Sequence, residues 1–185
     1  MRSFPLSLPF VLTVVGLAPL KGQSLHVAGI RPQPQISIGD TLTIAATPSN
    51  VNFTLVPGGV ASGSSPVTIT TTYHTVGLLS SISLYASLGS TSAALSGGTP
   101  VYNIPSSSVF GKDPTGGTAT SPTAFVQTNP VTGTGGSLKI ANYNALITLT
   151  GTLTDVLSLT IDLTSLPQTP AGTYTGTLTL MAQAF

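Results

Sequence analysis

The sequence predicts an all-β protein, an Ig-like antiparallel β-sandwich that follows an N-terminal leader. Three observations lead to this fold class. Apolar residues alternate with Ser and Thr in one short run after another from residue 36 to the end. Clusters of Gly, Pro and Ser separate the runs, and no stretch has the 3.6-residue apolar period of an amphipathic helix. Strands with one apolar face form antiparallel sheets, which bury that face by packing on each other.

The composition is poor in charge and in the residue types from which active sites are built. Charged residues make up 5% of the 185 residues, and the chain contains no Glu, Cys or Trp. A weakly charged, hydroxyl-rich surface repels its own copies weakly, so it favours self-association. Beyond residue 24, three basic residues stand against four aspartates, and no basic patch is present. Nucleic-acid binding is therefore not expected.

Residues 1–24 are expected to be a secretory signal peptide that is cleaved. Arg2 provides the positive charge, residues 4–20 are mostly apolar, and the small residues Gly22 and Ser24 follow. The apolar stretch is short for a membrane span and is interrupted by prolines. An uncleaved N-terminal anchor is the alternative. With the leader removed, we expect a secreted protein without a stable membrane span, in the periplasm or at the cell surface of a bacterium.

The remaining chain divides into a short N-terminal extension, residues 25–35, and a β-sandwich domain, residues 36–185. Strands are predicted where every second residue is apolar. In chain order, these runs are 42–46, 51–55, 67–73, 82–88, 138–140, 147–153, 157–163 and 174–184. Gly151 is expected to form a bulge, and Asp155 is expected to join two strands.

Residues 96–136 differ from the rest of the domain in composition. This stretch is rich in Gly, Pro, Ser and Thr, with short apolar islands at 101–104, 109–110 and 124–126. We interpret it as a loop-rich insertion with one or two short strands. A disordered linker between two domains is the alternative, and the apolar islands argue against it.

No residue is predicted to be catalytic, to bind a cofactor or to ligate a metal. His26 and His74 have no acidic or imidazole neighbour at ligand spacing. The aspartates are scattered and are interpreted as turn or surface residues; they are Asp40, Asp113, Asp155 and Asp162. Calcium bound by Asp113 and loop carbonyls is the alternative for that residue. The chain has no G-x-S-x-G motif. We therefore expect a non-enzymatic protein without cofactors.

The segment near the C-terminus carries a family resemblance. Pro170-Ala171-Gly172-Thr173-Tyr174, followed by alternating residues, resembles the closing strand of bacterial spore coat protein U-like and pilin-like domains. The resemblance implies an exported Ig-like sandwich in which Tyr174 plugs one end. It also implies assembly by strand addition, in which an extended segment completes the sheet of a neighbour. Residues 25–30 are the candidate donor segment, and the chain lacks the cysteine pair common in such domains.

The leading hypothesis is therefore a non-enzymatic, secreted structural or adhesive envelope protein, a pilin-like or coat-like subunit. Its expected partners are further copies or other envelope subunits, bound through strand addition. A polysaccharide-binding module that uses the 96–136 loops and Tyr102 is the first alternative. A small outer-membrane β-barrel is the second. The alternating strands and Phe185 favour it, and an aromatic content of 6% opposes it.

Overall fold

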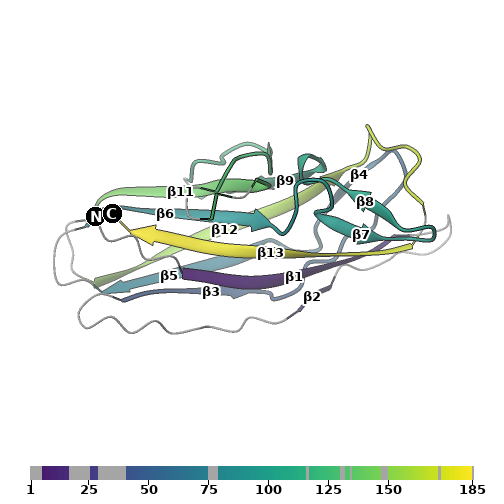
Figure 1. Ribbon diagram of the computed structural model, residues 1–185. Coiled ribbons are helices and arrows are strands. Elements are labelled where there is room, and N and C mark those ends of the chain that lie inside the picture. Colours follow the sequence, from purple (N-terminus) through teal and green to yellow (C-terminus); the bar gives the residue numbers. More distant parts are fainter. Residues whose placement is uncertain are drawn as a thin grey trace.

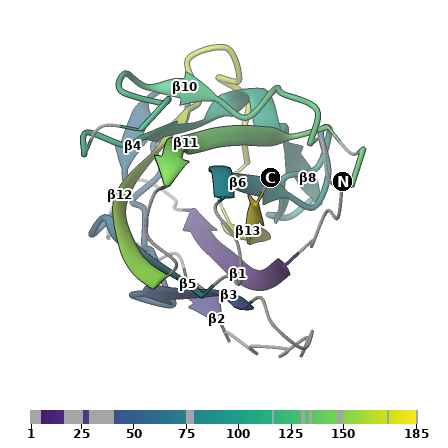
Figure 2. The same ribbon diagram turned by 90° about the vertical axis from the view of Figure 1, so that its left-hand side faces the viewer.

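Two antiparallel β-sheets pack face to face in the computed structural model, so the predicted all-β sandwich is confirmed (Figures 1 and 2). The structure describes residues 6–16, 26–28, 41–74, 79–115, 117–129, 132–133, 135–146, 150–170 and 172–184. Among these residues there is no α-helix, and the only helical turn is the 3-10 turn Ser106–Ser108.

The first sheet has β13 at its centre (Figure 1). Its strands lie in the order β11 (Ser137–Leu146), β6 (Leu79–Leu88), β13 (Gly172–Ala184), β1 (Leu6–Gly16) and β2 (His26–Ala28). Two short strands extend it, since β7 (Leu95–Gly97) pairs with β13 and β8 (Tyr102–Ile104) pairs with β7. The long C-terminal strand therefore has neighbours on both sides, β6 on one and β1 on the other.

The second sheet is built around β12. Its strands lie in the order β10 (Thr123–Ala124), β9 (Val109–Lys112), β12 (Thr150–Asp162), β5 (Val67–His74) and β3 (Thr41–Thr47), with β4 (Val60–Ser62) also paired to β12. In β5, the alternation predicted from the sequence is visible residue by residue. Val67, Ile69, Thr71 and Tyr73 are buried, and Thr72 and His74 are exposed. The period of two sorts the side chains between core and solvent.

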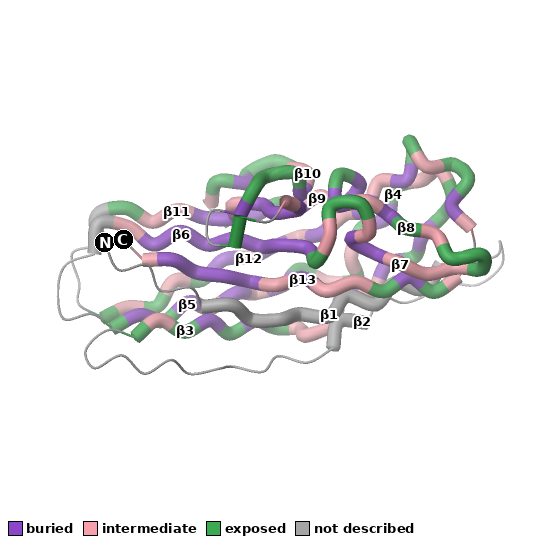
Figure 3. Tube along the Cα trace, viewed as in Figure 1, coloured by how far each residue is buried: buried purple, intermediate pink, exposed green. Residues whose placement is uncertain are grey.

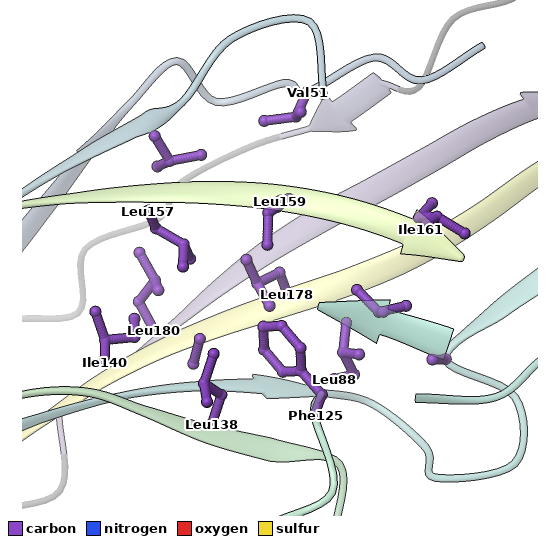
Figure 4. Close-up of a cluster of buried hydrophobic side chains, with 14 of the residues drawn as sticks. Val51, Leu88, Phe125, Leu138, Ile140, Leu157, Leu159, Ile161, Leu178 and Leu180 are labelled. Carbon is purple, nitrogen blue, oxygen red and sulfur yellow. The ribbon is translucent and has the colours of Figure 1, made fainter. Parts of the chain in front are cut away.

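The core between the sheets combines both layers with the insertion (Figure 4). Leu157 and Leu159 of β12 project toward Leu178 and Leu180 of β13, and Phe125 lies beside them. All five side chains are at most 3% exposed. Burying a side chain of this size stabilises the fold by about 1.5–3 kcal/mol. This shared core needs no disulfide, and the chain has no cysteine.

The 96–136 stretch packs on the sandwich at several points and contains more strand than expected. It includes nearly all of β7 together with β8, β9 and β10, where the sequence suggests one or two short strands. Phe125 enters the core, and the Asn129 side-chain amide donates to Met181 Sδ at 3.5 Å. This second contact lies on the outer face of the first sheet, where buried residues follow one another along β6 and the end of β13 (Figure 3).

Residues 51–55 are buried as predicted, but they do not form the predicted strand. Val51, Phe53 and Leu55 are at most 5% exposed. Between them, the Asn52 N–H donates to Ser64 Oγ and the Asn52 carbonyl accepts from the Ser64 N–H. This loop–loop contact satisfies the backbone of Asn52, and Leu55 forms an isolated β-bridge, but no named strand covers residues 51–55. Alternating burial requires an extended chain on the core, but not a continuous ladder.

The prediction of two strands joined at Asp155 is also wrong, because β12 runs unbroken from Thr150 to Asp162. Gly151 pairs in regular register with Tyr73, so the expected bulge is absent there. A Cβ on Gly151 would lie 2.4 Å from the Tyr73 hydroxyl, and this close approach explains the glycine. The irregularity lies in β11 instead, between Lys139 and Ala141. Residues 147–149 of the predicted run lie outside the described residues.

Candidate functional site

The pairing of β1 with β13 is the first feature that bears on function. β1 pairs with β13 over eleven residues, from Leu6 opposite Ala182 to Gly16 opposite Gly172. All eleven positions of β1 belong to the segment predicted to be a signal peptide. This edge of β13 is therefore filled by residues of the predicted signal peptide.

The side chains on the inner face of β13 are completely buried. Tyr174, Leu178, Leu180 and Ala182 are all 0% exposed with β1 in place. Backbone N–H and C=O groups along an unpaired strand edge form a template for another strand. The edge of β13 next to β1 is thus a candidate site for strand addition, with Gly172–Ala182 as its residues.

The predicted donor segment lies one strand away from this site. In β2, His26 pairs with Thr13 and Ala28 pairs with Val11, so β2 lies on the outer edge of β1. Of the predicted donor segment, residues 26–28 therefore lie in the first sheet, separated from β13 by β1, and the rest lies outside the described residues. For these residues to pair with β13, β1 has to leave.

Tyr174 closes one end of the sandwich, as its sequence motif suggests. Its side chain is fully buried, and its hydroxyl donates to the Pro170 carbonyl at 2.7 Å. A tyrosine that bonds back to the backbone a few residues upstream is a known corner of Ig-like sandwiches. Burial raises the pKa of Tyr174, with a smaller contribution from the nearby Tyr102. The corner positions the start of β13, where the strand-addition edge begins.

The turn at Gly97 and Gly98, next to Tyr174, requires glycine. Gly98 has φ +81°, and a Cβ there would lie 2.8 Å from the Tyr174 hydroxyl. At Gly97 a Cβ would lie 1.7 Å from the Thr173 carbonyl oxygen, which no small shift relieves. The Gly97-Gly98 pair therefore allows β7 to approach the first residues of β13.

Asp155 contradicts the prediction that the four aspartates lie in turns or at the surface, whereas Asp113 lies in its predicted turn but is buried. Asp155 is in the middle of β12 and 1% exposed, and Asp113 follows β9 and is 0% exposed. Asp113 does begin a turn, since its Oδ1 accepts from the Thr115 N–H at 2.9 Å and from the Thr115 hydroxyl. The sequence Lys112-Asp113-Pro114 predicts this turn correctly, but it does not indicate that the Asp113 side chain is buried.

The two buried carboxyls form a cluster with Tyr143 of β11. The Tyr143 hydroxyl donates to Asp155 Oδ1 at 2.5 Å. Burial raises the pKa of Asp155 to about 6; the Tyr143 bond opposes the rise, and a hydrogen bond and the charge of Asp113 add to it. Burial also raises the pKa of Tyr143, and its bond to Asp155 raises it further. The cluster therefore joins the two sheets and the insertion.

The other residues considered in the sequence are not brought together. His74 is exposed at the end of β5. Asp162 accepts from the Thr164 hydroxyl at 2.6 Å and from the Thr164 N–H at 2.9 Å, and these two bonds lower its pKa. Asp40 lies outside the described residues, and so does the side chain of His26. No group of three or more His or Asp residues that could hold a metal occurs within the described ranges.

Tyr102, the residue considered for polysaccharide binding, is half-buried and packs against the core. It lies in β8, close enough to Tyr174 to affect its ionisation. Its ring is thus partly committed to packing, which leaves less of it for stacking on a sugar.

No protein-family model, curated protein or solved structure matches the chain significantly. In the described part of the chain, no helix has the length and apolar character needed to cross a membrane.

Proposed function

We propose that this chain is a non-enzymatic, secreted structural or adhesive subunit of a bacterial envelope, pilin-like or coat-like, that joins other subunits by strand addition. One observation carries the proposal. The segment with the character of a signal peptide is the segment that pairs with β13 over eleven residues. Cleavage after residue 24 removes this strand and leaves one edge of a central strand unpaired.

An open edge of this length favours association with another chain. Residues 172–182 would present unpaired backbone groups beside an inner face made of Tyr174, Leu178, Leu180 and Ala182. Such a row of exposed backbone groups is a template for another strand. An extended segment from another copy, or from a different subunit, restores the ladder and covers the apolar face, which is the β-augmentation mode of binding.

The low surface charge agrees with a subunit in close contact with its neighbours. The chain carries five basic and four acidic residues in 185, so copies repel one another weakly. Residues 25–30 are the proposed donor because they follow the cleavage site directly and contain a strand-forming stretch, His26–Ala28.

The proposal is tested on the mature chain, residues 25–185, by sedimentation velocity. We expect polymers from this chain and monomers from a version that lacks residues 25–30. A synthetic peptide with the sequence of residues 6–16 should fill the edge of β13 and block polymerisation, whereas a scrambled peptide of the same composition should not.

Two results would contradict the proposal. Polymers that persist without residues 25–30 would exclude that segment as the donor. A mature chain that stays monomeric, and that unfolds at the same urea concentration as the full chain, would mean that β13 needs no partner in place of β1.

A further inference from the structure

The outer face of the second sheet carries a regular array of threonines. Residues of β3, β5 and β12 lie directly opposite one another in four rows, from Thr41–His74–Thr150 to Thr47–Thr68–Val156. Nine of these twelve positions are threonine and none is serine, although serine is abundant in the chain. The other three positions are Ala45, His74 and Val156. We call these twelve residues the threonine grid.

The threonine grid is open to solvent. All four grid positions of β3 are exposed, as are two of β5 and three of β12, and the remaining three are half-buried. Along β3 and β5, these positions alternate with residues of the core (Figure 3). Of the grid hydroxyls, only that of Thr43 donates a hydrogen bond within the described residues, at 3.4 Å to the Thr72 carbonyl. The hydroxyl groups are therefore available to a partner outside the chain.

The threonine grid contains no carboxylate, ammonium or guanidinium group. Asp155 lies on β12 but is buried, on the opposite face of that strand. Lys112 pairs with Ser158, beyond the last row of the grid. His74, at one corner, is the only ionisable side chain of the grid. Charge complementarity therefore requires an uncharged partner, because a charged ligand would lose hydration without gaining an opposite charge.

The size and composition of the threonine grid argue against a protein as that partner. Strands lie about 4.7–4.9 Å apart and rise about 3.3 Å per residue, so the grid covers about 400 Å². A stable protein–protein interface needs about 800 Å² from each partner. The grid also has no aromatic residue and no arginine, the residue types that dominate interface hot spots, and it offers no ring on which a sugar could stack. A second copy of the chain and a polysaccharide are therefore disfavoured.

The threonine grid is distinguished by its regular spacing. The same pair of groups, one hydroxyl and one methyl, recurs about every 4.8 Å across the strands and about every 6.7 Å along them. Threonine is branched at Cβ and is stiff at χ1, so these side chains lose little rotamer freedom when they bind. Such a surface suits a ligand that is neutral, rigid and periodic in two dimensions and that forms hydrogen bonds.

We propose that the threonine grid binds ice. Water molecules in an ice surface are uncharged and occupy a regular lattice, so several grid hydroxyls bond to them at once. The methyl groups between the hydroxyls gain by giving up contact with liquid water, since apolar surface is unfavourably hydrated. This site does not depend on strand addition, because the grid lies on the second sheet and the edge of β13 belongs to the first.

The middle of β5 is the most sensitive part of the threonine grid. Neighbouring strands of a sheet are rotated by about 20–25°, so a flat ice surface meets the middle strand of the grid best. Thr72 lies on that strand, between Thr43 and Thr152, and is exposed. Thr72→Lys places a hydrated ammonium group there, and Thr72→Ser removes only the methyl group. The matched control is Thr120→Lys, because Thr120 is an exposed threonine of the insertion, outside the grid.

The test uses the full chain and these three variants, each shown by circular dichroism to retain the strand content of the unaltered chain. The shape of a single, slowly grown ice crystal is observed in each solution, and the protein taken up by a growing ice hemisphere is measured. We expect the unaltered chain and Thr120→Lys to shape the crystal into facets and to enter the ice. Thr72→Lys should lose both effects, and Thr72→Ser should show weaker uptake.

Three results would overturn the proposal. The first is an unaltered chain that leaves ice crystals round and is excluded from growing ice as serum albumin is. The second is Thr72→Lys that shapes ice as the unaltered chain does. The third is a dimer, or binding to microcrystalline cellulose or chitin, that Thr72→Lys abolishes, which would assign the grid to a second copy or to a polysaccharide. All are measured on the full chain, in which β1 fills the edge of β13, so they do not depend on strand addition.

Discussion

Removal of one oxygen atom from Tyr174 tests how the start of β13 is held. The substitution Tyr174→Phe keeps the ring in the core and deletes only the hydroxyl that donates to the Pro170 carbonyl at 2.7 Å. The side chain is 0% exposed, so the phenylalanine ring keeps the same packing and the half-buried Pro170 carbonyl loses its donor. We therefore expect a loss of about 1 kcal/mol in the free energy of unfolding, the usual value of one such hydrogen bond.

A second substitution at the same position separates the hydrogen bond from the packing. Tyr174→Ala also removes the ring, and truncation of a buried aromatic side chain costs about 3–5 kcal/mol. The control is Tyr102→Phe, because Tyr102 is a half-buried neighbour on β8 whose hydroxyl makes no hydrogen bond among the described residues. We expect that control to change stability by less than about 0.5 kcal/mol.

Urea denaturation followed by circular dichroism measures all three variants, and thermal melts provide a second reading. For a chain of this length, a loss of about 1 kcal/mol lowers Tm by about 2–4 °C. If Tyr174→Phe unfolds at the same urea concentration as the unaltered chain, with the same slope, the hydroxyl does not anchor β13 and the corner has no energetic role. Equal losses in Tyr174→Phe and Tyr102→Phe would lead to the same conclusion.

Three further predictions concern Gly97 in the turn before β13, Phe125 in the insertion, and Tyr143 beside Asp155. Gly97→Ala should lower the free energy of unfolding by more than about 2 kcal/mol in urea denaturation, because its Cβ would lie 1.7 Å from the Thr173 oxygen; an unchanged midpoint would contradict this. Phe125→Ala should cost about 3–5 kcal/mol in the same assay if the insertion belongs to the core, whereas a linker would tolerate it. Tyr143→Phe should raise the pKa of Asp155 further, since the Tyr143 bond lowers it; a lower titration midpoint of the Asp155 carboxyl by NMR would refute this.

The parts of the fold that could be predicted from sequence are those in which burial alternates with solvent. The runs 67–73 and 174–184 lie in β5 and β13 because their apolar residues repeat with period two, although residues 180–183 at the end of β13 are buried on both faces. The run 51–55 has the same pattern without becoming a named strand, since a ladder needs a neighbour and the neighbour is a matter of tertiary structure. The sequence predicts that Asp155 joins two strands, but it lies within β12, where its carboxyl accepts a hydrogen bond from Tyr143 of β11. The residues around Asp155 do not indicate this partner, because it comes from another strand.

The candidate site was predictable only in part, for a related reason. Tyr174 could be placed from its Pro-Ala-Gly context, because that motif is local in the chain. Asp113 and Asp155 belong to two elements far apart in sequence, and no sequence neighbour of either residue indicates that Asp113 affects the pKa of Asp155. In the same way, the pairing of residues 6–16 with residues 172–182 cannot be read from either segment alone.

The central place of β13 has a kinetic consequence. Leu88 pairs with Leu178, and Leu8 pairs with Leu180, so the ladders of the first sheet join distant stretches of the chain. Closing such wide loops costs entropy before any contact repays it, which slows folding of β-rich domains to milliseconds or seconds. During that interval, half-formed sheets expose strand edges to other chains, so the local concentration of partly folded chains would decide between correct strand pairing and aggregation.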